Sequence, residues 1–300
     1  MMAKRRRALG MAVCLCMTTG AAVATPKSES ATTSAAVQAQ KTIGPEKGYL
    51  VLQGGGASVA EIFQRFVALA GGAKANIVLI PTAAASGLPG NVIPAGRLER
   101  MRTEMAQRLG VANVTVLHTL DRKLANSADF AEPLRHATGV WLLGGDEELL
   151  AKTYHGTRTE QELDALVARG GVVGGTSAGA DICAPFVFFT PQGKEAVPLD
   201  DFADYLKPDG FGLLRQAVIL PHFAQRHLEV APPKVLAIHP EALVIGIDEA
   251  TAIIVHGNRF EVVGQGSVEV YDKAHAGGNR TLLKNGQWFD LASRAIVAGA

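Results

Sequence analysis

The chain has 300 residues, of which 48% are hydrophobic and 19% are charged, and its formal net charge is +1. A chain of this length and hydrophobicity can bury a full core, which excludes disorder throughout and a collagen-like repeat. A charge so close to zero provides no basic surplus for binding phosphates, so we expect no nucleic-acid partner.

The N-terminus has the features of a secretory signal peptide. Residues 4–7 are basic, residues 8–17 are apolar, and Ala22-Val23-Ala24 has the small-x-small form of a cleavage site. The apolar run is shorter than the ~20 residues of a membrane-spanning helix, although an uncleaved anchor is the alternative. We therefore predict a signal peptide over residues 1–24, export to the periplasm or the extracellular space, and no membrane association of the mature chain.

Cleavage would change both the charge and the cysteine content. Residues 1–24 contain four basic residues and no acid, so the formal charge would fall from +1 to −3. Cys14 and Cys16 would be lost, which leaves Cys183 alone and excludes an internal disulfide. We expect Cys183 to be a packed apolar thiol.

Beyond this segment, residues 25–46 lack apolar periodicity and are predicted to form a flexible linker. A folded domain is then expected over residues 47–295. Its first part alternates predicted strands at 49–52, 75–80, 114–117, 139–143 and 171–174 with predicted helices at 59–70, 97–109 and 161–168. Further strands are predicted at 217–220, 242–247, 252–255, 260–263 and 267–270.

This alternation predicts the α/β class, with a mostly parallel central sheet flanked by helices and additional C-terminal strands. Glycines follow three of the strands, at residues 54–56, 144–145 and 174–175. Ligands of parallel sheets collect at the carboxyl ends of the strands. We therefore expect a site at these glycine turns.

The third turn continues as Gly175-Thr176-Ser177-Ala178-Gly179, which fits the G-x-S-x-G pattern between a strand and a helix. Small neighbours allow a sharp turn that presents a serine nucleophile, and the following helix aims N–H groups at a developing oxyanion. A simple strand–helix turn with a buried serine is the alternative. A phosphate-binding loop would need a following lysine or the G-x-G-x-x-G spacing of glycines, and neither is present, so phosphate binding is disfavoured.

A serine nucleophile needs a base, commonly a histidine that a carboxylate orients. His222 directly follows the strand at 217–220, and His118, which ends another strand, is the competing candidate. Asp248 and Glu249 directly follow the strand at 242–247. No H-E-x-x-H pattern of a zinc peptidase is present, and we expect neither a metal nor a cofactor.

The order of these candidates along the chain is serine, histidine, acid. An α/β-hydrolase has its acid between the serine and the histidine. The acids in that interval lie in a predicted helix start or a polar loop, and they are Asp181, Glu195, Asp200, Asp201, Asp204 and Asp209. An esterase of that type is therefore disfavoured.

Further blocks of motif residues stand in order along the chain: Gln53-Gly54-Gly55-Gly56, Ile80-Pro81-Thr82-Ala83, Leu143-Gly144-Gly145-Asp146, the Ser177 turn, Gly212-Leu213-Leu214, His222-Phe223 with Arg226, and Gly246-Ile247-Asp248-Glu249-Ala250-Thr251-Ala252. In these blocks the chain resembles the cyanophycinase-like serine peptidases, relatives of aspartyl dipeptidase. The resemblance covers roughly residues 48–272. It implies a flavodoxin-like, class I glutamine amidotransferase-like fold.

The same resemblance implies a role for individual residues. Ser177 would be the nucleophile, His222 the base and Glu249 the orienting acid. The backbone N–H groups of Gly145 and Ala178 would form the oxyanion hole. Substrate contacts would come from Gly55, Asp146 and Arg226.

Departures from the family pattern concern the substrate. Leu220-Pro221 stand where the family has Asp-Gln, Glu147 replaces a glutamine, and residues 227–229 replace further arginines after Arg226. Those family residues would recognise a β-aspartyl-arginine unit, so we expect a small peptide or β-aspartyl-type substrate without assigning cyanophycin. An inactive binding protein on the same fold is the alternative function. The oligomeric state stays open, with a homodimer as one candidate.

Overall fold

The computed structural model describes residues 42–57, 59–189, 205–273 and 280–299. The predicted signal peptide and residues 25–41 of the predicted linker lie outside these ranges. Residues 42–46, at the end of the predicted linker, contact the folded part of the chain. The N–H of Ile43 donates to Asn258 Oδ1 (2.7 Å), and its carbonyl accepts from the N–H of Arg215 (2.8 Å). The packed chain therefore begins before residue 47.

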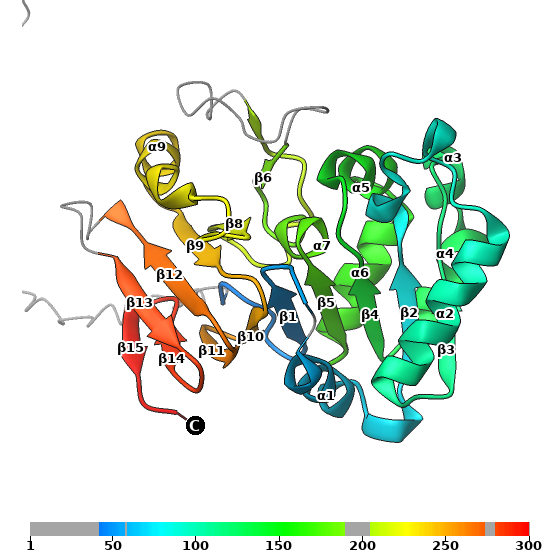
Figure 1. Ribbon diagram of the computed structural model, residues 1–300, viewed down its shortest axis with the longest axis horizontal. Helices are drawn as coiled ribbons and strands as arrows, with labels where there is room; N and C mark the ends of the chain where they lie inside the picture. Colours follow the sequence, from blue (N-terminus) through cyan, green and yellow to red (C-terminus); the bar gives the residue numbers. More distant parts are fainter. Residues whose placement is uncertain (1–41, 58, 190–204, 274–279, 300) are drawn as a thin grey trace, which may run out of the picture. The chain divides into compact units, whose positions relative to one another are not determined.

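The largest sheet of the described residues has nine strands in the order β15-β14-β11-β10-β1-β5-β4-β2-β3 (Figure 1). Five strands are parallel: β1 Tyr49–Gln53, β2 Asn76–Ile80, β3 Asn113–Val116, β4 Gly139–Leu142 and β5 Val172–Thr176. Four more extend the same sheet with antiparallel pairing: β10 Thr251–His256, β11 Arg259–Gly264, β14 Trp288–Asp290 and β15 Ala295–Val297. The predicted parallel core is thus present, and the C-terminal strands widen it.

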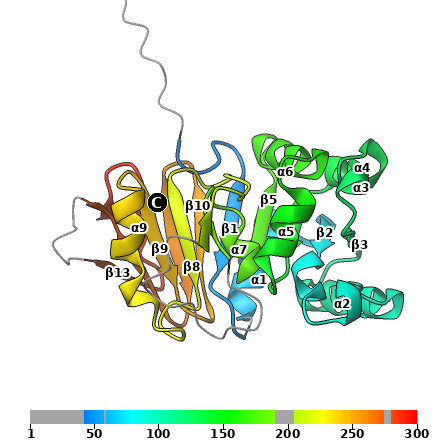
Figure 2. The same ribbon diagram turned by 90° about the horizontal axis from the view of Figure 1, so that it is seen from above.

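Helices cover both faces of the parallel strands (Figures 1 and 2). One face carries α1 Ala60–Leu69 and α2 Ala95–Leu109, and the other carries α3 Arg122–Ala125, α4 Ala128–His136, α5 Glu147–Tyr154 and α6 Arg158–Ala168. Successive strand side chains point to opposite faces, so Leu50 and Leu52 belong to the core cluster that includes residues of α4–α6, while Val51 belongs to the cluster that includes residues of α1 and α2. In the described ranges no helix has both the length and the hydrophobicity that crossing a bilayer requires.

A second sheet of four strands has the order β13-β12-β9-β8. Its strands are β8 Ala217–Pro221, β9 Leu243–Ile247, β12 Ser267–Tyr271 and β13 Thr281–Lys284, and only the β8–β9 pairing among them is parallel. Helix α9, Pro232–Ile238, packs on one face against Val218 and Val244. The other face, through Ile219 and Ile245, joins the core cluster that contains Leu50. The sequence did not predict this separate sheet.

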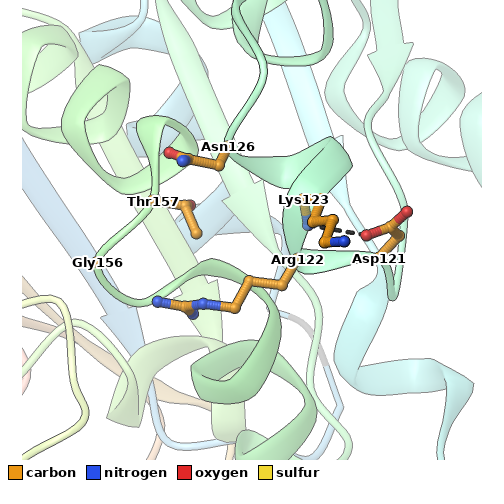
Figure 3. Close-up of a pocket in the computed structure, with 6 residues that line it drawn as sticks. All are labelled: Asp121, Arg122, Lys123, Asn126, Gly156 and Thr157. Atoms are coloured by element: carbon orange, nitrogen blue, oxygen red, sulfur yellow. Dashed lines mark hydrogen bonds between the residues drawn. The ribbon is translucent and has the colours of Figure 1, made fainter.

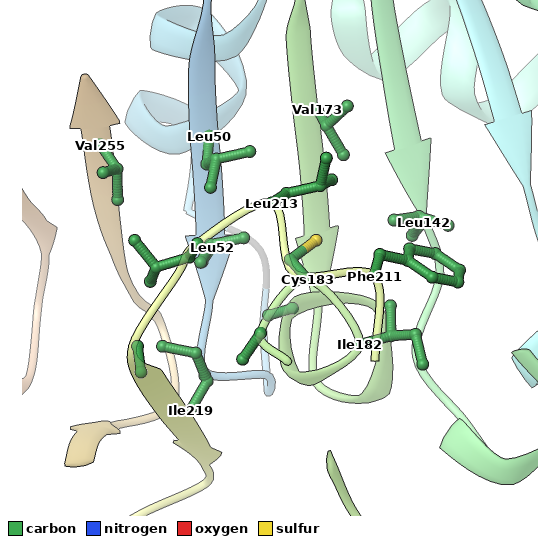
Figure 4. Packing of buried hydrophobic residues seen from close by; sticks show 14 of the residues in the cluster. Leu50, Leu52, Leu142, Val173, Ile182, Cys183, Phe211, Leu213, Ile219 and Val255 are labelled. Carbon is green, nitrogen blue, oxygen red and sulfur yellow. The ribbon is translucent and has the colours of Figure 1, made fainter. Parts of the chain in front are cut away.

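Shorter elements complete the described structure. The helix α7, Ala178–Asp181, follows β5, and the strands β6 Val187–Phe188 and β7 Leu206–Lys207 pair with each other. Single 3-10 turns are η1 Gly72–Lys74, η2 Thr82–Ala85, η3 Pro89–Asn91 and η5 Leu228–Val230. Cys183, just beyond α7, is fully buried among Leu52, Val173 and Leu213, as Figure 4 shows. Burial raises the pKa of its thiol, which agrees with the expected packed apolar cysteine.

Gly174 in β5 lies against two buried aromatic rings, so its substitution tests how tightly the core is packed. A Cβ there would lie 2.5 Å from Cε3 of Trp141 and 3.1 Å from Cδ2 of Phe66, and both rings are fully buried. Because overpacking forces buried rings off their rotamers, we expect Gly174→Ala to lower the free energy of unfolding by about 1–3 kcal/mol in urea denaturation.

Gly96→Ala is the matched control. Gly96 lies within α2, where a new Cβ would meet no atom within 4 Å. Alanine is the better helix former, so this variant should be up to about 1 kcal/mol more stable. Equal changes in both variants would contradict the packing argument.

Candidate active site

Ser177 lies in a strained turn between β5 and α7. Its φ of 52° and ψ of −122° fall in a region that costs a non-glycine residue about 1–3 kcal/mol. Its N–H donates to the carbonyl of Gln53 at the end of β1 (3.0 Å). Its carbonyl accepts from the N–H groups of Ala180 (2.8 Å) and Asp181 (3.0 Å). These bonds hold the turn from both sides, in the strand–turn–helix context that the G-x-S-x-G pattern predicts.

The residues around Ser177 leave no room for side chains. A Cβ at Gly175 would lie 2.1 Å from the carbonyl oxygen of Gly179, and one at Gly179 would lie 2.3 Å from that of Leu142. A Cβ at Gly144, just after β4, would lie 3.0 Å from the Cβ of Ser177. The need for small neighbours therefore comes from specific close approaches of the backbone.

His222 follows β8 directly and approaches Ser177 from the second sheet. Its N–H donates to the carbonyl of Gly54 after β1 (2.7 Å), and its Nε2 lies 2.8 Å from Ser177 Oγ. The competing candidate, His118, contacts another residue, because its Nδ1 lies 3.0 Å from Oγ1 of Thr82. The described structure thus brings His222, and not His118, to the serine.

Glu249, two residues after the end of β9, contacts the other ring nitrogen. Its Oε1 lies 2.7 Å from His222 Nδ1. A carboxylate can only accept hydrogen bonds, so Nδ1 carries the proton and Nε2 accepts from the Ser177 hydroxyl. Asp248, the other candidate acid, directs its carboxylate to donors in two other segments. Ser177, His222 and Glu249 therefore form one continuous hydrogen-bonded chain.

The carboxylate partner of His222 thus follows the histidine in sequence, unlike the order of an α/β-hydrolase. Among the acids that precede His222, Asp181 is buried in α7. Its burial, and then the charge of Glu147, raise its pKa well above the usual range, while the N–H of Phe188 opposes them. Glu195, Asp200, Asp201 and Asp204 lie outside the described residues.

The surroundings of His222 favour a neutral ring. Burial lowers the pKa of the imidazole, the hydrogen bond to Glu249 raises it, and the positive charge of Arg226 lowers it again. The net shift is downward from the ordinary value of about 6.5. At neutral pH the ring is therefore uncharged, which is the form in which Nε2 can accept a proton.

Two glycines of the β1–α1 loop lie against the ring and the carboxylate. A Cβ at Gly55 (φ +106°) would lie 2.2 Å from Cε1 of His222. A Cβ at Gly56 (φ +69°) would lie 2.6 Å from Oε2 of Glu249. The structure thus places Gly55, expected to contact substrate, face to face with the imidazole. The position of Gly56 was not anticipated.

Of the two expected oxyanion-hole residues, Ala178 follows Ser177 directly, and Gly145 follows a glycine that approaches the Ser177 side chain. Ala178 is the first residue of α7, so its N–H has no acceptor within the helix. Gly145 has a φ of +144°, and a Cβ there would lie 2.1 Å from the carbonyl oxygen of Ala83. The residue before it, Gly144, approaches the Ser177 side chain. The oxyanion-hole role of the two N–H groups stays a prediction.

The other two residues expected to contact substrate are Asp146, next to Gly145, and Arg226, four residues after His222. Asp146 caps α5, with its Oδ1 accepting from the N–H of Glu148 (2.9 Å). Arg226 lies one turn after His222, and its N–H donates to the carbonyl of that histidine (2.8 Å). The Arg226 side chain is exposed, and its charge reaches the imidazole.

Two glutamines to which the sequence assigned no role support the site. Gln53 is fully buried and donates from Nε2 to the carbonyls of Gly55 (3.2 Å) and Ala57 (3.4 Å). Gln225 accepts from the N–H of Glu249 through Oε1 (2.9 Å). The position of Gln53 at the head of a glycine block was a usable signal. Gln225 carries no such signal, because only the fold brings it to Glu249.

The described residues also form a pocket of about 640 Å³ that shares no residue with the hydrogen-bonded chain. Figure 3 shows its lining residues, which are Asp121, Arg122, Lys123, Asn126, Gly156 and Thr157. Among all the residues that the structure describes, no three His, Cys, Asp or Glu side chains lie together as the ligands of a metal ion would.

Comparison with known proteins matches the model of Peptidase family S51 to residues 50–263. The cyanophycinase of Trichormus variabilis is 30% identical over 257 residues, which cover 79% of this chain and 82% of that protein. The cyanophycinase of Geminocystis herdmanii is 30% identical over 214 residues, covering 71% and 75%.

Solved structures are similar over comparable lengths. A peptidase from an acI-B1 Actinobacterium has a TM-score of 0.64 at 26% identity and covers 82% of this chain and 98% of its own. A putative peptidase E protein from Listeria monocytogenes EGD-e has a TM-score of 0.50 at 18% identity, covering 73% and 100%, which is a likeness of fold. Together with the nine-stranded sheet, these neighbours agree with the class I glutamine amidotransferase-like fold.

The contact between Gly55 and His222 makes a direct test of the site. We expect Gly55→Ala to slow covalent labelling of Ser177 by a fluorophosphonate about 100-fold, because the new Cβ displaces the imidazole. Gly71→Ala is the control, since Gly71 has nearly the same φ (+107°) with no atom within 4 Å of a new Cβ. Equal losses in the two variants would trace the effect to backbone strain rather than to the ring.

Proposed function

Because the chain belongs to Peptidase family S51, it is a serine-type hydrolase that acts on peptide bonds, and we propose that Ser177, His222 and Glu249 are its nucleophile, base and orienting acid. One observation carries this proposal. The distances of 2.8 Å from Ser177 Oγ to Nε2 and 2.7 Å from Nδ1 to Glu249 Oε1 connect all three groups. We further propose a small peptide or β-aspartyl isopeptide as the substrate.

The first half of the reaction forms an acyl-enzyme. Nε2 of His222 takes the hydroxyl proton as Ser177 Oγ attacks the carbonyl carbon of the substrate. Glu249 stabilises the imidazolium that results, since its carboxylate accepts from Nδ1. The imidazolium then gives its proton to the leaving amine as the C–N bond breaks.

The second half hydrolyses the acyl-enzyme. Neutral His222 takes a proton from a water molecule, and the hydroxide attacks the ester carbonyl. Ser177 leaves with the proton returned by Nε2, which restores the starting state. In both halves the N–H groups of Gly145 and Ala178 would stabilise the oxyanion, which is commonly the largest single contribution to such catalysis.

The charge near His222 supports an acidic substrate group. Arg226 is exposed one turn beyond the base, where a guanidinium can bind a carboxylate with two parallel hydrogen bonds. The free carboxylate of a β-aspartyl residue is such a group. The curated relatives are named cyanophycinases, but Leu220-Pro221, Glu147 and residues 227–229 depart from the family pattern expected for β-aspartyl-arginine units.

Ser177→Ala tests the nucleophile. We expect kcat on β-aspartyl dipeptides to fall at least about 1,000-fold and fluorophosphonate labelling to disappear, with the melting temperature close to that of the wild type. The same assay should show slower turnover of cyanophycin than of the dipeptides by the wild type. Undiminished hydrolysis by the variant would remove Ser177 from the mechanism. A wild type that binds peptides but is never labelled would favour an inactive binding protein.

The charge of Arg226 should also affect how the reaction rate depends on pH. The rate should rise with pH through a midpoint below the ordinary histidine value, because the base must be neutral and its pKa is lowered. Arg226→Gln removes a charge that opposes protonation, so the pKa of His222 rises and the midpoint moves to higher pH. KM for acidic substrates should increase as well.

Arg226→Lys keeps the charge and is the control for this prediction. Its midpoint should stay near that of the wild type, although a lysine cannot form the two-pronged contact of a guanidinium. A midpoint unchanged in Arg226→Gln would contradict the electrostatic coupling between residue 226 and the imidazole.

A further inference from the structure

Asp248 lies between the segment that carries His222 and the segment that carries Glu249. It is 7% exposed, and its Oδ1 accepts from the N–H of Ala224, two residues after the histidine (3.1 Å). Its Oδ2 accepts from the N–H (2.9 Å) and the hydroxyl (2.6 Å) of Ser267, at the start of β12. All three contacts are donors, so both oxygens act as acceptors, which is the role of a carboxylate.

The backbone around Asp248 follows the same connections. Its N–H donates to the carbonyl of Ser267 (3.1 Å), and the N–H of Phe223 donates to the carbonyl of Ile247 (3.2 Å). The Phe223 ring lies over Gly246, where a Cβ would come within 2.4 Å of it. The turn after β8 is thus attached to the end of β9 at several points, and Asp248 supplies a carboxylate contact to its backbone.

The side chain of Glu249 is less tightly packed than that of His222. Its side chain is 39% exposed, compared with 13% for His222. Both segments also contain strained backbone, with φ of 54° at His222 and 55° at Ala250. Conformations of this kind persist only where the surrounding structure enforces them. The direction of the carboxylate therefore depends on the position of its backbone as well as on its contacts with His222 and Gly56.

We propose that Asp248 is a positioning residue that ties the His222 turn to the Glu249 turn and so maintains the hydrogen bond between Nδ1 and Oε1. This inference rests on the proposed function, in which that bond orients the base. Asp248 has no hydrogen bond to Ser177 or to the His222 imidazole in the described structure. It acts through the backbone of the two turns.

Asp248→Asn tests the hydrogen bonds of this residue, because asparagine has nearly the same size as aspartate but different hydrogen-bonding groups. An amide has one acceptor oxygen and one donor nitrogen, so in either orientation a donor faces the N–H of Ala224 or the donors of Ser267. We expect the plateau rate of fluorophosphonate labelling to fall about 10- to 100-fold. The midpoint of its pH profile should also move to lower pH, because a weakened bond to Glu249 no longer raises the pKa of His222. Ser267→Ala removes only the hydroxyl contact and should cause a smaller change in the same directions.

Asp290→Asn is the matched control. Asp290 in β14 accepts from the N–H of Ala292 (3.1 Å) and from the N–H (2.8 Å) and hydroxyl (2.9 Å) of Ser293, which are the same types of donor. It belongs to the antiparallel end of the nine-stranded sheet. Its substitution should lower Tm without changing the labelling rate or its midpoint.

The outcomes are distinguishable. A wild type that is never labelled overturns the proposed function and this inference with it. A labelled wild type, with Asp248→Asn equal to it in plateau and midpoint, overturns this inference alone. If Asp248→Asn lowers the plateau labelling rate but leaves the midpoint of the pH profile unchanged, this inference is also overturned, since that result indicates a structural role only. If Asp248→Asn does not fold, Ser267→Ala decides by the same two readouts.

Discussion

The hydrogen bond from the N–H of His222 to the carbonyl of Gly54 (2.7 Å) joins the two sheets of the molecule at the site. The nucleophile belongs to the first sheet, after β5, whereas the base and the acid follow β8 and β9 of the second. The bond requires the two sheets to approach closely, and a Cβ at Gly54 would lie only 2.3 Å from the carbonyl oxygen of Ile247. Glycine at this position is therefore a condition for the contact between Ser177 and His222.

Strained backbone gathers at the same place. Of the non-glycine residues with positive φ in the described ranges, Ser177, His222 and Ala250 belong to the three turns that meet here. At about 1–3 kcal/mol each, such conformations need bonds that hold them. The carbonyls of Gln53 and Gly55 supply two, accepting from Ser177 (3.0 Å) and Ala250 (2.9 Å). The end of β1 thus acts as the common support of the site, and burial near it keeps the imidazole neutral.

Most elements of the parallel part could be predicted because strands buried on both faces are continuous apolar runs. The strands predicted at 49–52, 75–80 and 139–143 agree with β1, β2 and β4 within one residue at each end. Helix α4 was missed, since it contains Pro133, and a proline interrupts a helical pattern. The short β14 and β15 carry too few residues for a periodic signal. The strand conformation of β14 depends on pairing with β11, and that of β15 on pairing with β14.

Apolar patterning and turn residues were sufficient to place Ser177 after a buried strand in a turn of small residues, and to place His222 and Glu249 after two other strands. They also left His118 and Asp248 in equivalent positions, because a strand end indicates an edge of a sheet and not a neighbour. The family resemblance implied His222 and Glu249, but their contact with Ser177 depends on the tertiary structure, because the hydrogen bonds join segments that are distant in the chain. Apolar periodicity and turn chemistry act over a few residues, whereas the contact of two sheets depends on the packing of the whole domain.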